Sequence, residues 1–462
     1  MSIASLLYVA RDALGVSQIG IDVVGANIAN VNTSGYSRQR PVISSTGGDY
    51  VRGMVVQTSV AVDKIERLYD RYLEGQVVLQ RQNIGYSSTL NDRLSSIESI
   101  LNEAQSGGLN DQLNKFWAAW ETLSANPSGQ VERDTVAAMA ESVATKLNSF
   151  SGDLVRLKTD IKTSIRDVVN KINSLAVEIR NLNEKVAETG AKGGETNILS
   201  DKLMGLLGDM AESVGIMWNE ADDGTVSVFL ENGIPLVERL VAYQLKAEDV
   251  GDRMVVSSAQ VNPDEELNGF ITKGKLGALI ESQDEVIPDY QQLLNNFARS
   301  LAEAVNDLHH QGYDSRGNLG GDFFVYSDNA PAATIRLNPE IAQDLRLIAA
   351  GSTVNGDGEN AASIAALKDE LIMENGSSTL NAYFAAIIGR IGRQVEDSST
   401  DLEHQNAILT NVTNRRESVA GVSIDEEMIE LMKFQMSYQA AGRLVNVTDK
   451  LLDILMNLGV SS

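Results

Sequence analysis

The chain has 462 residues, no cysteine and a formal net charge of −25 at pH 7. The lack of cysteine excludes disulfides and thiolate metal sites, and the acidity argues against nucleic acid or an anionic membrane as a partner, because both require Lys and Arg surfaces. No apolar run approaches the roughly 20 residues of a membrane span, and the first residues lack the basic and apolar regions of a secretory signal peptide.

An apolar repeat of seven residues marks the N-terminal end. It predicts a helix over residues 2–30 with the seam of a coiled coil or bundle. The repeat consists of Leu7, Leu14, Ile21 and Ile28. Turn-forming residues follow, among them Asn30 and Gly35, and glycine accepts the positive φ that turns require. Residues 41–65 are rich in β-branched side chains and are predicted to be extended.

Helical patterns dominate residues 69–213. The longest runs from Val136 to Val186 with apolar residues three or four apart, and glycines end it after residue 189. A single helix of this length measures on the order of 80 Å, which is typical of rods and bundles rather than of enzymes. Shorter helices are predicted before it, with Trp117 and Trp120 on one face, and after it, over residues 197–212.

Over residues 214–269 the apolar residues recur at every second position, as in strands, and acidic residues are dense. Asn232-Gly233 is a typical hairpin turn in this stretch. This stretch predicts a small acidic β-rich subdomain. A helix is predicted over 276–310 and another over 379–416, while 323–378 is expected to be loop-rich with short strands.

A second stripe closes the chain. Ser423 is the expected N-cap of the last helix, and Glu426 is expected to complete a capping box with it. The stripe repeats every seven residues at Ile424, Leu431, Tyr438, Val445 and Leu452, with Phe434, Ala441 and Leu455 three residues on. Because each stripe is too apolar to stay solvated, we expect the stripes of the two ends to face each other, antiparallel or at a shallow angle.

These patterns predict a mainly α fold with a small β-rich subdomain (α+β), in which a long-helix bundle carries N- and C-terminal helices paired as a coiled coil. The expected domains are residues 1–68 with 417–462 (terminal), 69–213 with 270–322 and 379–416 (bundle), 214–269 (acidic β-rich) and 323–378 (loop-rich).

Chemical sites are poorly supported. Adjacent His309 and His310 point about 100° apart on a helix, so a helix C-cap role is preferred to a metal site. Residues 269–275 have the glycine spacing of a P-loop, but Leu276 replaces the Ser or Thr that holds magnesium. The acids at 425–427 fit the first turn of a helix. We therefore expect no catalytic, cofactor or metal site.

Several motifs resemble a known family. Asn27-Ile28-Ala29-Asn30 with Gly35-Tyr36 and Arg38 is similar to the N-terminal signature of bacterial flagellar rod, hook and hook-associated proteins, and residues 421–458 are similar to their C-terminal segment. Middle features, such as Gly274-Lys275-Leu276-Gly277 and the long helices, resemble the hook-associated members best. Residues 325–380 look too short for the outer β domain that longer members insert there.

The resemblance implies a structural, non-enzymatic component of the extracellular flagellum, exported through the flagellar type III channel, that forms the junction between hook and filament as a helical ring. The implied partners are further copies of the chain, the hook protein below, the next hook-associated protein above, and an export chaperone at the C-terminal helix. The predicted assembly interface comprises Leu7, Leu14, Ile21, Asn27, Ile28, Asn30, Gly35, Tyr36, Leu431, Phe434, Tyr438, Val445, Leu452 and Leu455.

Two alternatives remain. A hook or rod component would be favoured by a middle that is mainly β. A hydrolytic enzyme would be favoured by a pocket in which His309, His310 and several acids converge.

Overall fold

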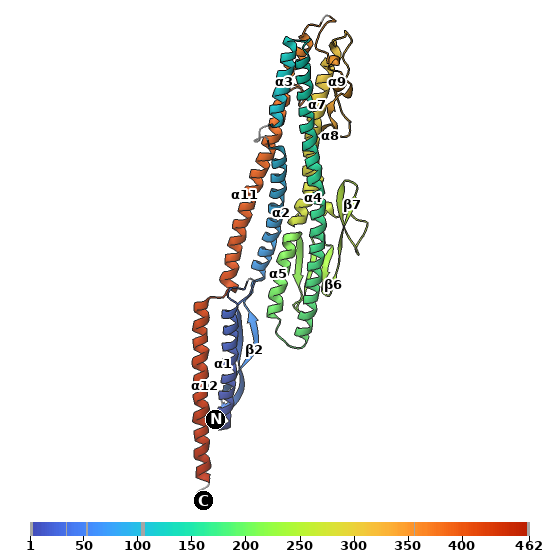
Figure 1. The fold of residues 1–462 in the computed structure, drawn as a ribbon. Helices are drawn as coiled ribbons and strands as arrows, with labels where there is room; N and C mark the ends of the chain where they lie inside the picture. The colour runs from blue at the N-terminus through green and yellow to red at the C-terminus, as the bar shows by residue number, and fades with distance from the viewer. Residues whose placement is uncertain (1–2, 34, 52–53, 103–106, 355, 460–462) are drawn as a thin grey trace.

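The computed structural model describes residues 3–33, 35–51, 54–102, 107–354 and 356–459. The molecule is elongated, with both termini at one end (Figure 1). It is mainly helical with small antiparallel sheets, as predicted. Among the described residues, no helix combines the length and apolar character that a membrane span requires.

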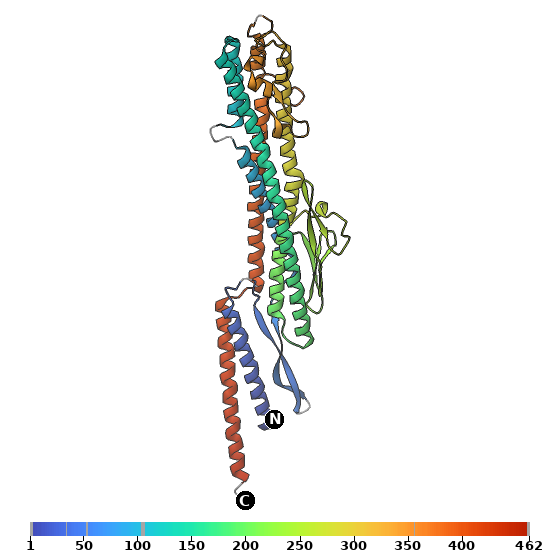
Figure 2. The ribbon, with the colours of Figure 1, turned by 45° about the vertical axis from the view of Figure 1, so that its right-hand side comes forward.

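The terminal end contains two helices and a hairpin. Helix α1 (Ile3–Ala29) lies beside α12 (Ile424–Gly459) and beside the antiparallel strands β1 (Gln39–Val51) and β2 (Met54–Arg67) (Figure 2). The predicted extended segment is thus a long hairpin that packs on α1. The turn before it uses Gly35 at φ +78°, as its glycine suggested.

The remainder, here called the body, is built around one very long helix, α4 (Gln130–Ala191). Its 62 residues correspond to on the order of 90 Å. Most of the predicted apolar positions from Val136 to Val186 are buried. Three predicted positions differ: Met139, Val168 and Leu182 are half-buried. Their neighbours Ala140, Val169 and Asn183 are buried.

Three helices flank α4 in the first half of the body. They are α2 (Arg71–Leu101), α3 (Leu109–Ala125) and α5 (Asn197–Ser213). The N-cap of α2 is Asp70, whose carboxylate accepts the backbone N–H groups of Tyr72 and Leu73 and so satisfies two donors of the first turn that have no partner within the helix.

The predicted β-rich stretch forms two small sheets that lie against α4 (Figure 1). One has the antiparallel order β3-β4-β5-β6 and the other is the hairpin β7-β8. The strands are β3 (Ile216–Glu220), β4 (Val226–Leu230), β5 (Pro235–Glu238), β6 (Val241–Ala242), β7 (Leu245–Val250) and β8 (Arg253–Ser258).

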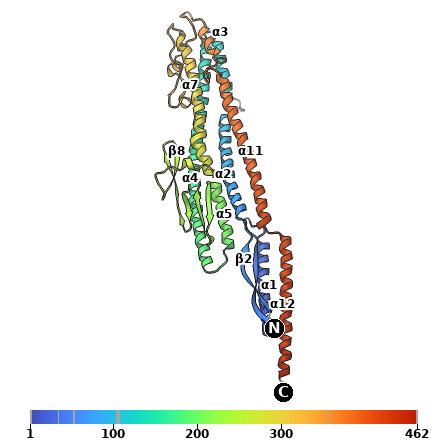
Figure 3. The same cartoon turned by 180° about the vertical axis from the view of Figure 1, so that it is seen from behind.

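Two later segments complete the bundle. Helix α6 (Gly274–Glu281) continues through a π-helical turn, Ser282–Val286, into α7 (Ile287–Gln311). Helix α11 (Leu380–Ala420) then runs back along α2 and also contacts α3 and α7 (Figure 3). This packing of the late helix against the early ones was expected, since each alone leaves an apolar face uncovered.

The segment expected to be loop-rich contains more structure than predicted. A short 3-10 turn, Asn268–Phe270, precedes α6. The chain from residue 312 to 379 carries several short elements. They are β9 (Phe324–Val325), α8 (Pro331–Thr334), β10 (Arg336–Leu337), α9 (Pro339–Gln343), a 3-10 turn (Leu345–Leu347) and α10 (Glu359–Ala366). The short helices were missed because each is too brief to show a helical period. Phe323 and Phe324 pack with Phe116 and Trp120 at this end.

Candidate assembly interface

Helices α1 and α12 pack antiparallel at the terminal end. Ser17 lies against Ser437, with their hydroxyl oxygens 3.1 Å apart, and Asn27 bonds Glu427. Between these contacts, Gly20 lies directly on the Phe434 ring, so close that a Cβ at Gly20 would be 2.5 Å from ring carbons. The predicted pairing of the two ends is therefore present in the folded chain.

The centre of this packing differs from the predicted stripes. Buried positions of α12 repeat every seven residues at Glu427, Ala441 and Thr448, in phase with half-buried Phe434. On α1 the buried positions include Ala10, Gly20 and Val24. The predicted Leu7, Leu14, Ile21, Ile28, Leu431, Val445 and Leu452 are half-buried, whereas Tyr438 and Leu455 are exposed.

The physical reason is close approach. Small residues at the centre let two helix backbones come together, and the larger apolar side chains then lie on the flanks. The expectation that the large stripes face each other directly was wrong in this detail. It correctly identified the seven-residue period, and of the arrangements that it left open the antiparallel one is present.

A second apolar stripe runs along the outer side of α12. Its members are all at least 41% exposed and form two groups, one before residue 437 and one after residue 446, with spacings of three or four residues within each group. They are Ile424, Met428, Met432 and Met436 in the first group and Val447, Leu451 and Ile454 in the second. A helix that is apolar on two sides is normally covered on both. We call this set the outer stripe.

Buried polar contacts tie the turn after α1 to the two terminal helices. Glu427 is 1% exposed and its two carboxylate oxygens face Arg38 Nε at 2.6 Å and Asn27 Nδ2 at 2.9 Å. Asn27 also bonds both backbone groups of Gln39 and accepts the Tyr36 hydroxyl. Burial, with the charges of Asp201 and Glu427, raises the pKa of Tyr36 to about 12, so this phenol stays protonated and remains a donor.

The acids at the start of α12 therefore do more than balance the helix dipole. Glu426 pairs with Arg38 at 2.6 Å in an exposed position rather than closing a capping box with Ser423. Sequence reasoning missed Glu427 and undervalued Arg38 because partners 389 positions apart leave no local pattern. The signature residues Asn27, Tyr36 and Arg38 were the available signal.

The remaining predicted residues lie in the turn after α1. Asn30 Nδ2 donates to the Ala26 carbonyl, its Oδ1 accepts the Thr33 hydroxyl, and Gly35 supplies the positive φ. These residues shape the turn, while Tyr36 and Asn27 connect it to the helix pair.

The histidines do not form a reactive site. His309 is fully buried, with Nδ1 2.6 Å from the Gly321 carbonyl and Nε2 2.9 Å from the Ala349 N–H. Because Nε2 accepts, Nδ1 carries the proton. The C-cap role expected for His309 was wrong: its ring ties two loops together. His310 points elsewhere and pairs with exposed Asp322.

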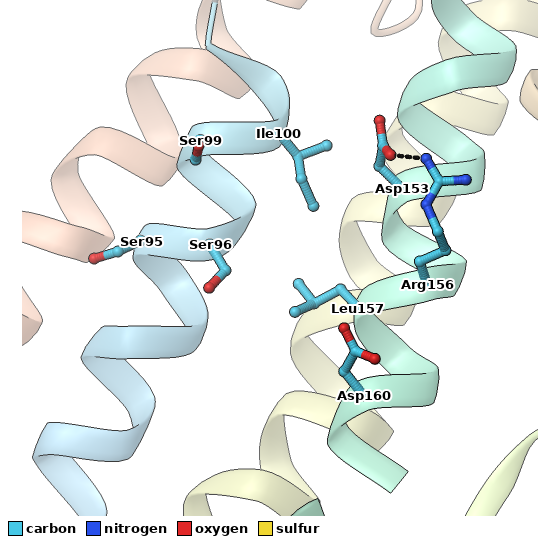
Figure 4. A pocket seen from close by; sticks show the side chains of 8 residues that line it. All are labelled: Ser95, Ser96, Ser99, Ile100, Asp153, Arg156, Leu157 and Asp160. Carbon is cyan, nitrogen blue, oxygen red and sulfur yellow. Dashed lines mark hydrogen bonds and ion pairs between the residues drawn. The ribbon is translucent and has the colours of Figure 1, made fainter. Parts of the chain in front are cut away.

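Concave features of the body are shallow. One open depression lies between α2 and α4, lined by Ser95, Ser96, Ser99, Ile100, Asp153, Arg156, Leu157 and Asp160 (Figure 4). Arg156 bonds Asp153 on the same helix, so these two charged groups satisfy each other. Within the described residues, no group of three or more His, Asp or Glu could hold a metal ion.

Comparisons with known proteins agree with this architecture. A family model described as the flagellar hook-associated protein FlgK helical domain matches residues 94–324, half of the chain. The chain belongs to the FlgK family. Models of the flagella basal body rod protein and of the flagellar basal body rod FlgEFG protein C-terminal match residues 7–36 and 416–458, which cover most of α1 and α12.

Relatives in the FlgK family cover almost the entire chain. Flagellar hook-associated protein 1 of Bacillus subtilis is 28% identical over 98% of this chain and 97% of its own. The Escherichia coli protein of the same name is 23% identical over 98% and 100%. The solved flagellar hook junction protein FlgK of Burkholderia pseudomallei has the same fold, with a TM-score of 0.68 at 15% identity, over 75% of this chain and 100% of that one.

Membership in this family resolves one alternative. The chain has the FlgK helical domain, and its middle is mainly helical rather than mainly β. The family is one of structural flagellar proteins, and the histidines and acids do not converge in a pocket of the kind that an enzyme reading required.

Proposed function

We propose that the chain is a structural subunit of the bacterial flagellum and forms the junction between hook and filament. The outer stripe of α12 carries this proposal. It leaves two groups of exposed apolar side chains on α12, at the end of the molecule where both termini lie, and burying them releases about 25 cal/mol per Å². FlgK-family membership and the names of the relatives support the same role.

The proposed mechanism is assembly rather than catalysis. Copies of the chain associate in a helical ring through the terminal domain, residues 1–68 with 417–462, placed innermost. The bundle and the acidic β-rich subdomain lie outward. The hook protein packs below the ring and the next hook-associated protein above it, in the extracellular flagellum. No cofactor is needed.

Delivery is part of the proposal. The chain travels through the flagellar export channel, and an export chaperone covers α12 before secretion. The exposed methionines of α12, such as Met432 and Met436, suit this second partner because flexible thioether side chains adapt to different surfaces.

The test is genetic and structural. Cells that lack the chain should carry hooks without filaments and release filament subunits into the medium, as seen by electron microscopy and protein analysis of the medium. A restored copy should return filaments. Deleted cells that still build normal filaments on their hooks would refute the junction role.

A further inference from the structure

Residues 35–38 lie between the terminal helix pair and the body and bond to both. On the body side, the Ser37 N–H and hydroxyl donate to Asp201 of α5 at 3.0 and 2.8 Å. The Arg38 N–H donates to the Ala420 carbonyl at the end of α11, and the Arg38 carbonyl accepts the Leu68 N–H, both at 2.8 Å.

Two further ion pairs close the body side of this region. Arg67 pairs with the same Asp201 at 2.9 Å, and Arg416 pairs with Glu74 at 2.8 Å, all four side chains being almost fully buried. Arg416 also donates to the Gly35 carbonyl at 3.4 Å. The chain crosses between the terminal end and the body near residues 68 and 420, and both crossings are bonded to the backbone of Arg38.

On the terminal side, the contacts come from side chains. Arg38 reaches Glu427 of α12, and the Tyr36 hydroxyl reaches Asn27 of α1, which in turn bonds Glu427. Glu427 is 1% exposed, so a shift that takes its carboxylate away from Asn27 and Arg38 would leave a charged group unpaired away from water.

We propose that residues 35–38 together with Asn27 and Glu427 form a rigid joint, which fixes the direction of the α1–α12 pair relative to the body. Glu427 is the central positioning residue, since it accepts a hydrogen bond from Asn27 of α1 and forms an ion pair with Arg38 of the 35–38 segment. The joint goes beyond the proposed assembly role: it concerns how the outer stripe is oriented, and it holds whichever partner covers that stripe.

Glu427→Gln is a precise probe of this joint. In the native structure both carboxylate oxygens face donors, Arg38 Nε and Asn27 Nδ2. A glutamine amide has one acceptor and one donor end, so its NH2 group meets a donor in either orientation. Glu426→Gln is the matched control. It removes a charge that faces the same Arg38 at the same 2.6 Å, but in an exposed position where ion pairs contribute little.

The orientation can be measured by pulsed electron spin resonance. Because the chain has no cysteine, cysteines introduced at exposed Lys202 on α5 and Gln435 on α12 accept spin labels selectively. Helix pairing is checked separately in a chain with Ser17→Cys and Ser437→Cys, whose native oxygens are 3.1 Å apart, by formation of a disulfide on a non-reducing gel.

We expect one narrow distance peak for the native sequence and for Glu426→Gln, and loss of that single peak in Glu427→Gln while the 17–437 disulfide still forms. A broad distribution in the native chain, or an unchanged peak in Glu427→Gln, would overturn the joint. Loss of the disulfide in Glu427→Gln would also overturn it, because Glu427 would then hold the two helices together rather than set their direction.

Discussion

Asparagine side chains on helices hold the starts of strands in this molecule. Within the described chain, four asparagines bond both the N–H and the C=O of the first residue of a strand. The pairs are Asn27 with Gln39, Asn173 with Leu245, Asn183 with Val226, and Asn306 with Phe324. Each amide supplies the donor and the acceptor that a neighbouring strand would otherwise provide, and so it satisfies backbone groups that packing removes from water.

Asn183 provides the strongest test, because it is fully buried on α4 and also donates to the Arg239 carbonyl. Asn183→Leu should lower the free energy of unfolding by roughly 1–3 kcal/mol for each backbone group left unpaired. Urea denaturation measures this. Asn170→Leu, at an exposed position of the same helix, should change stability little. Equal stability of Asn183→Leu and the native chain would contradict the role assigned to this amide.

His309 gives the body a defined response to acid. Burial lowers the pKa of His309 from 6.5 to about 4, so the unfolded chain binds the proton more tightly than the folded one. Stability should therefore fall as pH drops from about 6.5 toward 4, by about 2 kcal/mol between pH 7 and pH 5 for this group. His309→Asn should remove that part of the pH dependence in urea titrations, and His310→Ala should retain it. The same pH dependence in His309→Asn would contradict the assignment.

At the scale of elements, the apolar periods of the sequence correctly predicted where helices lie, but not which face of a helix is buried. The helix over residues 136–186 and the seven-residue repeat of the last helix are evident in the sequence. The face of α12 that meets α1 is not evident in the sequence, for two reasons. Helix α12 carries two apolar stripes, and the buried line that meets α1 contains the polar residues Glu427 and Thr448. Likewise, Asn183 at a buried position of α4 could not be expected from hydrophobicity alone.

Gly20 tests the close approach of α1 and α12. Gly20→Ala would place a Cβ 2.5 Å from the Phe434 ring and should loosen the pair. Gly15→Ala, on the same helix with no atom within 4 Å of its Cβ position, should instead stabilise α1 by up to about 1 kcal/mol. Limited proteolysis of α12 reports the difference. Faster cleavage in Gly15→Ala than in Gly20→Ala would contradict the packing described.

At the scale of the whole molecule, the chain divides into a self-sufficient body and a terminal end. The buried apolar core of the body is continuous from Val78 to Ile391 and, among the described residues, includes none from α1, the β1–β2 hairpin or α12. The terminal end connects to the body mainly through polar contacts. This division could be anticipated from the two terminal stripes, whereas the polar joint could not, because it unites residues 27–38, 201 and 416–427.

A fragment of residues 69–416 should therefore fold on its own. We expect cooperative melting close to the main transition of the full chain, measured by circular dichroism, since the fragment keeps the entire apolar core. A fragment without a cooperative transition would show that the terminal end is required for the body to fold.

The outer stripe is the central element of the account, and one pair of variants tests it directly. Met432→Glu with Met436→Glu places charges on the outer stripe at positions that are 50% and 62% exposed, so the melting temperature should be unchanged. Val131→Glu with Val155→Glu makes the same change at exposed positions of α4. In cells lacking the native chain, electron microscopy should show hooks without filaments for the α12 variant and normal filaments for the α4 variant. Normal filaments with the α12 variant would contradict the claim that this surface builds the junction.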